Sequence, residues 1–130
     1  MISIDEFKKI DVKVGTVRSA VRVPETDKLL RLTVDFGLKP VASDATGSAD
    51  QPQAAGLGEE RDVRQIISGI AAYVSEPQSL EGRQLAFVTN LEPRTIRGLE
   101  SNGMLFAVGT GETFAFLTPD RDVPSGTSAH

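Results

Sequence analysis

The sequence contains no cysteine, a single histidine and few aromatic residues. Without cysteine, the chain can form no disulfide scaffold and offers no thiol nucleophile, which fits a cytoplasmic protein. The one histidine, His130, is the last residue, so the side chains that most often bind zinc are missing. We therefore expect no metal site and no cofactor.

Long hydrophobic runs are also absent. No run approaches the roughly 18 apolar residues of a membrane-spanning helix, and the amphipathic start, MISIDEFKKI, lacks the apolar centre of a signal peptide. The net charge of −4 argues against indiscriminate nucleic-acid binding, which needs a basic surface, but is compatible with a local basic patch. We expect a single cytoplasmic domain over residues 1–130, with no membrane contact.

The order of apolar patterns predicts a small closed β-barrel with a short N-terminal helix. Ser3 and Glu6 form a capping box, which predicts a helix over residues 4–9. Residues 30–36 alternate between apolar and polar, as in a half-buried strand, and Gly15 interrupts a valine-rich strand, where we expect a bulge or bend. Strands are expected within residues 11–23, 29–37, 62–70, 83–91, 103–110 and 113–119, before a Pro- and Gly-rich tail.

Residues 38–61 lose this patterning. They consist mainly of Ala, Gly, Ser, Asp, Gln and Pro, which cannot bury enough apolar surface to offset the entropy of ordering. We predict a flexible insertion loop between two strands. Its two ends should lie close together, because closing a long loop costs little more than closing a short one.

No enzyme signature is present. The sequence has no GxSxG, Walker, GxGxxG or HExxH motif. The GTGET stretch at residues 109–113 lacks the lysine and the following helix of a phosphate-binding loop, and it lies between two apolar strands, so we predict a hairpin turn. The acidic pairs of the chain lie in low-complexity or tail segments, where nothing desolvates them. We expect a protein that is not an enzyme.

The segment NLEPRTIRGLESNGM, residues 90–104, joins two apolar runs with a connection longer and more polar than a turn requires. Arg94 and Arg97 are three residues apart, and the guanidinium fork suits phosphates and base edges. Two interpretations stay open on these residues alone. The segment is either a binding surface or a solvated connection in which Glu92 and Glu100 pair with the arginines.

Four stretches together carry a family resemblance: DVKVGTV, DKLLRLTVDFG, IISGI and NLEPRTIRGLESNGMLFAV. The chain resembles the tRNA-binding domain found at the C-terminus of many methionyl-tRNA synthetases and in the endothelial monocyte-activating polypeptide. The same domain occurs in the phenylalanyl-tRNA synthetase β subunit, in free-standing tRNA-binding proteins and in CsaA chaperone-like proteins. The resemblance covers nearly the whole chain except residues 38–61.

The resemblance implies an all-β fold, an oligonucleotide-binding (OB) five-stranded barrel with a short N-terminal helix and an extra C-terminal strand or tail. It also implies binding of tRNA by shape rather than by sequence, and a homodimer for free-standing members. In the family, the tRNA contacts lie in the loop after the fourth strand and at the start of the fifth. Carried onto this chain, they are Asn90, Arg94, Arg97, Ser101 and Met104.

The aromatic residues refine these expectations. All six phenylalanines, Phe7 and Phe106 among them, fall at apolar positions where we expect core burial. Almost no ring is then left to stack on the bases of an extended strand, so the chain fits recognition of a folded RNA better. For Met104, core packing at the start of a strand is an equally good explanation.

The run GMLFAVG, residues 103–109, is apolar at consecutive positions, which predicts burial on both of its sides. Either the N-terminal helix or a second subunit should then cover the outer face, and the latter supports a homodimer. Among the remaining basic residues, we expect Lys28 and Arg31 to extend the RNA-binding surface.

The leading hypothesis is a non-catalytic, structure-specific tRNA-binding protein, free-standing or acting in trans with an aminoacyl-tRNA synthetase of the methionyl type. The alternative is a CsaA-like secretion chaperone that binds unfolded polypeptide through an apolar groove. A purely structural dimerisation module is a third class, and an enzyme is the least supported one.

Overall fold

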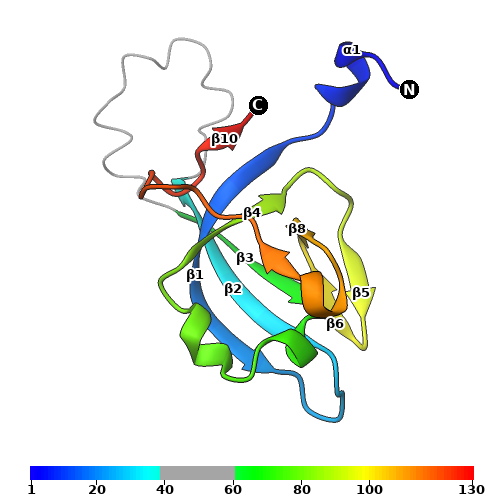
Figure 1. Ribbon diagram of the computed structural model, residues 1–130, viewed down its shortest axis with the longest axis vertical. Coiled ribbons are helices and arrows are strands. Elements are labelled where there is room, and N and C mark those ends of the chain that lie inside the picture. Colours follow the sequence, from blue (N-terminus) through cyan, green and yellow to red (C-terminus); the bar gives the residue numbers. More distant parts are fainter. Residues whose placement is uncertain (39–60) are drawn as a thin grey trace.

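The computed structural model describes residues 1–38 and 61–130, which form a strongly curved β-sheet around one core (Figure 1). The predicted all-β, barrel-like architecture with one short helix is confirmed. The elements are α1 (Ile4–Phe7), β1 (Val12–Arg22), β2 (Leu30–Leu38), β3 (Arg61–Ser68), the 3-10 helices η3 (Ala71–Tyr73) and η4 (Pro77–Leu80), β4 (Gln84–Val88), β5 (Arg94–Ile96), β6 (Leu99–Ser101), β7 (Met104–Leu105), β8 (Ala107–Val108), η5 (Gly111–Thr113), β9 (Ala115–Phe116) and β10 (Ser128–Ala129).

β1 is the central strand of the sheet. The strand order is β3-β2-β1-β4-β7, and β10 also pairs with β1. The first half of β1 pairs with β4 and the second half with β2, with the change of partner at Thr16. Next to this point, a Cβ on Gly15 would lie 2.7 Å from the Phe36 ring, so close packing requires glycine there. The bulge predicted at Gly15 lies instead between Val17 and Ser19, where the register shifts.

The core fills the inside of the curved sheet. The apolar residues that alternate along β2 are buried, as their spacing predicts. Phe36 and Phe87 meet edge to face, with ring centroids 5.5 Å apart. Burying one such side chain contributes about 1.5–3 kcal/mol. The largest wholly buried side chains are those of Phe87, Leu30, Leu32, Ile66, Leu80, Leu85, Val17 and Val34.

The barrel closes where β6 and the residues after it meet β3. The amide of Asn102 donates to the carbonyl of Gln65 at 2.9 Å, and the amide of Ile67 donates to Ser101 Oγ at 3.0 Å. Ser101 Oγ in turn donates to the carbonyl of Gly103 at 3.1 Å. A buried hydroxyl thus takes the place of a carbonyl in the ladder that closes the barrel.

The N-terminal helix stands apart from the barrel. Its capping box is confirmed, because Ser3 Oγ accepts from the Glu6 amide and Glu6 Oε1 accepts from the Ser3 amide, both at 3.1 Å. α1 has four residues, fewer than predicted, and none of them is buried. Figure 1 shows it projecting beyond the sheet, so it does not cover the outer face.

Two of the six phenylalanines lie outside the core, and the prediction of burial is wrong for them. Phe7 is 44% exposed and Phe106 is 42% exposed. The run 103–109 breaks into β7, which pairs with β4, and β8, which pairs with β9. Its outward side chains, including Phe106, therefore lack the cover that the sequence predicts, at least within the part of the chain that the structure describes.

Of the insertion predicted over residues 38–61, residues 39–60 lie outside the described residues, and the two end residues belong to strands. Its flanks are Leu38, at the end of β2, and Arg61, at the start of β3. These two residues are cross-strand partners. The ends of the insertion are therefore close together, as predicted.

Candidate nucleic-acid interface

Residues 94–101 form a two-stranded hairpin, β5 with β6, rather than the irregular loop expected from the sequence. Its turn consists of Arg97 and Gly98, with φ angles of 53° and 80°. Two consecutive positive φ angles define the type I′ turn, which joins strands in the tightest hairpins and usually carries asparagine or glycine at its first position. Because arginine occupies that position here, the turn is hard to see in the sequence.

Both predicted arginines lie on the hairpin, Arg94 at the start of β5 and Arg97 in the turn. Arg94 and Arg97 are exposed, and within residues 1–38 and 61–130 neither guanidinium has a hydrogen bond or ion pair to another residue. Glu92 and Glu100 form no ion pair with them in these ranges. The interpretation as an internally paired connection therefore finds no support among the described residues.

Ser101 is buried and Asn90 is exposed, and the side chains of both form hydrogen bonds to the backbone of other segments. Ser101 is 4% exposed, and its hydroxyl both accepts from Ile67 and donates to Gly103. The side chain of Asn90 donates to the carbonyl of Lys9 at 2.6 Å and accepts from the amide of Asp11 at 2.9 Å. Each of these polar groups already has the partners that it needs inside the protein.

Met104 lies on an apolar face at the end of the barrel that carries both termini. It is 43% exposed, so it is not a core residue. The apolar face surrounds a hollow of about 380 Å³. It is lined by Phe7, Ile10, Val12, Val88, Leu91, Met104, Phe106, Ala129 and His130.

Arg31 belongs to a row of residues that leads to the hairpin. Arg31 on β2 pairs with Ile67 on β3, the amide of Ile67 donates to Ser101, and Ser101 on β6 pairs with Arg94 on β5. Adjacent strands are about 5 Å apart, so exposed Arg31 lies three such steps from Arg94. Lys28 is exposed in the preceding loop, where its carbonyl accepts from the amide of Ala71 on η3.

A second pair of arginines, on the barrel wall, is bound by one carboxylate, which offsets one of their two positive charges. Arg18 Nη2 and Arg61 Nε donate to Asp35 Oδ2 at 2.6 and 2.8 Å, and the amide of Gly37 donates to Oδ1 at 2.8 Å. Burial raises the pKa of Asp35, but the Gly37 amide and the two guanidinium groups together lower it below its ordinary value. The carboxylate is therefore charged at neutral pH and holds both arginines.

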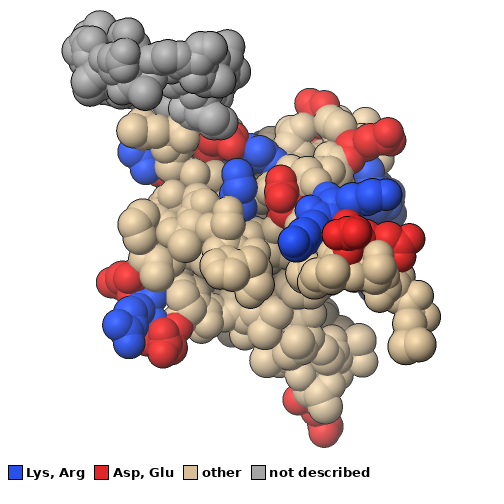
Figure 2. Space-filling view, turned by 90° about the horizontal axis from the view of Figure 1, so that it is seen from above, with Lys and Arg blue, Asp and Glu red and all other residues tan. Residues whose placement is uncertain are grey.

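Charges of both signs are interleaved on the face that Figure 2 shows, beside a broad area without charged residues. This agrees with a net charge of −4. No metal-binding group of three or more His, Cys, Asp or Glu side chains occurs in the described ranges. No helix in the described part of the chain is long and apolar enough to cross a bilayer.

The fold and the hairpin define an OB-type barrel, and comparison with known proteins narrows the class. The family described as "Putative tRNA binding domain" matches residues 54–128. A methionine–tRNA ligase from Methanocorpusculum labreanum is 42% identical over the whole chain, which covers 16% of that ligase. A Helicobacter pylori methionine–tRNA ligase is 39% identical over 97% of this chain, again 16% of the ligase. The chain thus spans about a sixth of these relatives.

Solved structures agree with this assignment. A MetRS-related protein from Pyrococcus horikoshii has a TM-score of 0.75 and 32% identity, and the match covers all of this chain and 98% of that one. A CsaA chaperone from Bacillus anthracis has a TM-score of 0.72 at 24% identity, covering 100% and 99% of the two chains, which shows a shared fold. The chain belongs to the tRNA-binding domain family, as its motifs predict.

Proposed function

We propose that this protein binds folded tRNA without catalysing a reaction, and that the β5–β6 hairpin is the main contact. The observation that carries the proposal is the pair Arg94 and Arg97. Within the described residues, both are exposed and without a polar partner, and they stand on a short, tightly turned hairpin in a domain of this family. Guanidinium groups that are free of a carboxylate partner can bind phosphates through two parallel hydrogen bonds.

The remaining predicted site residues have different parts in this proposal. Arg31 extends the phosphate-binding surface along the row that leads to Arg94. Lys28 extends it further, into the loop between β1 and β2. Asn90 and Ser101 position the segment through the bonds described above; exposed Asn90 remains a candidate RNA contact, whereas the buried Ser101 hydroxyl acts through the backbone that it holds. The proposed contact uses only a few cations, so affinity should be modest, and it should fall with salt in proportion to the number of phosphates that these cations contact.

Titration of the full chain with total tRNA by filter binding tests the proposal. Between about 50 and 200 mM salt, affinity should fall roughly 10- to 150-fold, as expected for two to four phosphate contacts. A single-stranded RNA of the same length should bind more weakly, because the hairpin presents a fixed pair of cations rather than a row of stacking rings. Absence of tRNA binding, or equal affinity for both RNAs, would contradict the proposal.

We also propose that the chain acts in trans with a methionyl-tRNA synthetase, to which it delivers tRNA. The other option is a free-standing tRNA-binding protein that works without a synthetase. The support for the role in trans is the chain's 42% identity to one sixth of a methionine–tRNA ligase. Addition of the chain to a methionyl-tRNA synthetase that lacks such a domain should lower the KM for tRNA and leave kcat unchanged, since only ground-state binding is added. An unchanged KM at saturating chain would contradict this role.

A second copy of the chain is the proposed occupant of the apolar face. Phe7, Met104 and Phe106 are each more than two-fifths exposed there, and an apolar surface of this kind favours a symmetric dimer. Light scattering should give twice the chain mass. Phe106→Glu should give a monomer, whereas Val108→Glu, at an equally exposed position outside the hollow, should remain a dimer. A monomeric wild type would contradict the proposal.

The CsaA-like alternative rests on the same hollow, because an apolar groove also suits an unfolded polypeptide. It predicts binding of a reduced, unfolded protein that Phe106→Glu abolishes and that tRNA does not affect. If the wild type binds no unfolded polypeptide with or without tRNA, this alternative is excluded.

A further inference from the structure

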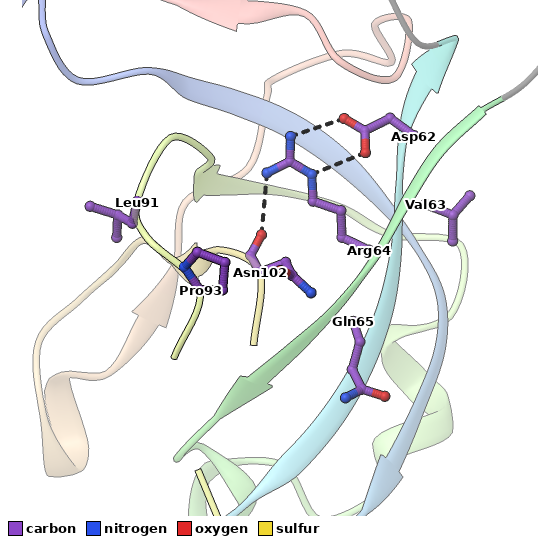
Figure 3. Close-up of a pocket in the computed structure, with 7 residues that line it drawn as sticks. All are labelled: Asp62, Val63, Arg64, Gln65, Leu91, Pro93 and Asn102. Carbon is purple, nitrogen blue, oxygen red and sulfur yellow. Dashed lines mark hydrogen bonds and ion pairs between the residues drawn. The ribbon is translucent and has the colours of Figure 1, made fainter. Parts of the chain in front are cut away.

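A polar cavity lies beside the β5–β6 hairpin. Of the residues that line it, only Leu91 also lines the apolar face. The cavity volume is about 420 Å³, within the range of small-molecule sites. In Figure 3, β3 forms one side of the cavity. The other side is formed by Leu91 and Pro93, which precede the β5–β6 hairpin, and by Asn102, which follows it. The cavity is lined by Asp62, Val63, Arg64, Gln65, Leu91, Pro93 and Asn102.

Asn102 presents a free amide from a fixed backbone. Its N–H donates to the carbonyl of Gln65 at 2.9 Å, and its carbonyl accepts from Arg64 Nη1 at 3.2 Å. Within residues 1–38 and 61–130, the side-chain amide itself has no hydrogen-bond partner. The fixed backbone thus places a donor and an acceptor, both available to a ligand, at the cavity wall.

The charge at the cavity is already compensated, so the site does not suit a phosphate. Arg64 Nε and Nη2 donate to the two carboxylate oxygens of Asp62, each at 3.0 Å, and Nη1 also donates to the carbonyl of Thr89 at 2.7 Å. The Arg64 guanidinium is further fixed 5.2 Å from the centroid of the Phe36 ring. The ligand should therefore be uncharged and polar at its edge.

Apolar side chains complete the walls. Leu91 and Pro93 lie on the side of the hairpin segment, and Val63 lies on β3. All three are exposed in the free protein. A flat ring with apolar faces and a hydrogen-bonding edge matches this combination, because its faces would contact these side chains while its edge pairs with the amide.

We propose that this cavity holds one unstacked nucleobase of the bound RNA, an inference that rests on the proposed tRNA binding. Arg94 directly follows Pro93 of the cavity wall and pairs with Ser101, the residue before Asn102. A phosphate on Arg94 and a base at Asn102 would thus belong to the same stretch of RNA. An amide can pair with an edge of any base, so the pocket reads whether a base is unstacked rather than which base it is.

Two RNA hairpins that differ only in one bulged 2-aminopurine test this inference. The wild type should bind the bulged hairpin about tenfold more tightly, as expected for one hydrogen-bonded and packed base, and the probe's fluorescence should change on binding. Asn102→Ala should lose this preference, and pocket-filling Val63→Phe should lose it too. Glu100→Ala, a neighbouring exposed residue outside the cavity, is the matched control and should keep it.

Asn102→Ala should also leave the salt dependence of binding unchanged, since no phosphate contact is removed. In one outcome, the wild type binds tRNA, but Asn102→Ala and Val63→Phe prefer the bulged RNA hairpin as strongly as the wild type does. The base pocket is then disproved, and tRNA binding stands. If both variants bind bulged and paired hairpins equally weakly and with a lower salt slope, the cavity contacts phosphates and the inference is wrong. If the wild type binds no tRNA, both proposals fall.

Discussion

Two pairs of arginines in the same barrel have opposite surroundings. Arg18 and Arg61 both donate to one carboxylate, that of Asp35, which is 4% exposed. Arg94 and Arg97 stand on the β5–β6 hairpin with no polar partner within the described ranges. The first pair belongs to the fold, whereas the second pair is free to meet a polyanion.

Exposure alone does not separate the two pairs. The side chains of Arg18 and Arg61 are 52% and 42% exposed, yet both guanidinium groups are bound to Asp35. A phosphate would have to compete with that carboxylate at the barrel wall, but not at the hairpin. The absence of a carboxylate partner, together with the family motif that contains the hairpin, supports the hairpin as the proposed RNA contact.

The largest expected effect is the loss of stability when Arg18 and Arg61 lose the carboxylate of Asp35. Asp35→Asn should lower the free energy of unfolding by about 2 kcal/mol at neutral pH, because a buried anion that binds two guanidinium groups is lost, with the figure reduced for their exposure. Urea denaturation measures this change. Asp62→Asn is the control and should cost less, because the Asp62 carboxylate binds one guanidinium and is 20% exposed, against 5% for Asp35. An equal loss in both variants would contradict the special role of Asp35.

The same carboxylate should give stability a defined acid dependence. The folded pKa of Asp35 lies below its ordinary value of 3.8, so its ionised form stabilises the protein above that pH and the contribution is lost as the pH falls through the folded pKa. The stability difference between wild type and Asp35→Asn should be constant from about pH 5 to 7 and shrink below about pH 4. A difference that grows on acidification would contradict this assignment.

A smaller effect is expected where the hairpin joins the barrel. Ser101→Ala should lower the free energy of unfolding by about 1.5 kcal/mol, because the buried Ile67 amide loses its acceptor. Ser79→Ala, at an exposed position, should change it by less than about 0.5 kcal/mol. If thermal and urea unfolding give the same stability for both variants, Ser101 does not help to close the barrel.

The smallest expected effect is that of Arg97→Asn, which should raise stability while it weakens tRNA binding. Arg97 has a φ of 53°, a conformation that costs most side chains free energy but that asparagine tolerates. Arg97→Asn should therefore raise the free energy of unfolding by about 0.5 kcal/mol and at the same time weaken tRNA binding. A variant that is both more stable and an equally good binder would show that the strained arginine has no part in binding.

Features that depend on residues close together in the sequence were predictable. The capping box at Ser3, the alternating strand β2 and the turn at residues 109–113, which does join β8 to β9, follow from spacing within a few residues. The joined ends of the insertion also follow, because a long loop between paired strands must return to its start.

Long-range partners were not predictable. Asn90 is tied to Lys9 and Asp11, some 80 residues earlier, and Ser101 bonds Ile67 across the closing seam; no local pattern encodes either. The hairpin was missed because arginine occupies its left-handed turn position. The exposed Phe106 was missed because an apolar surface residue and a core residue look alike in one sequence.

The most direct test of the account compares the tRNA affinity of two double variants, R94A/R97A and R18A/R61A, at a temperature where circular dichroism shows both to be folded. Each removes two positive charges, and R83A/R121A serves as a further charge-matched control. The account predicts that R94A/R97A lowers affinity about tenfold or more, reduces the salt slope by about two and leaves stability unchanged. R18A/R61A should be less stable but bind within about threefold of the wild type. Equal losses of affinity in all three would contradict it, because total charge rather than the hairpin would then hold the RNA.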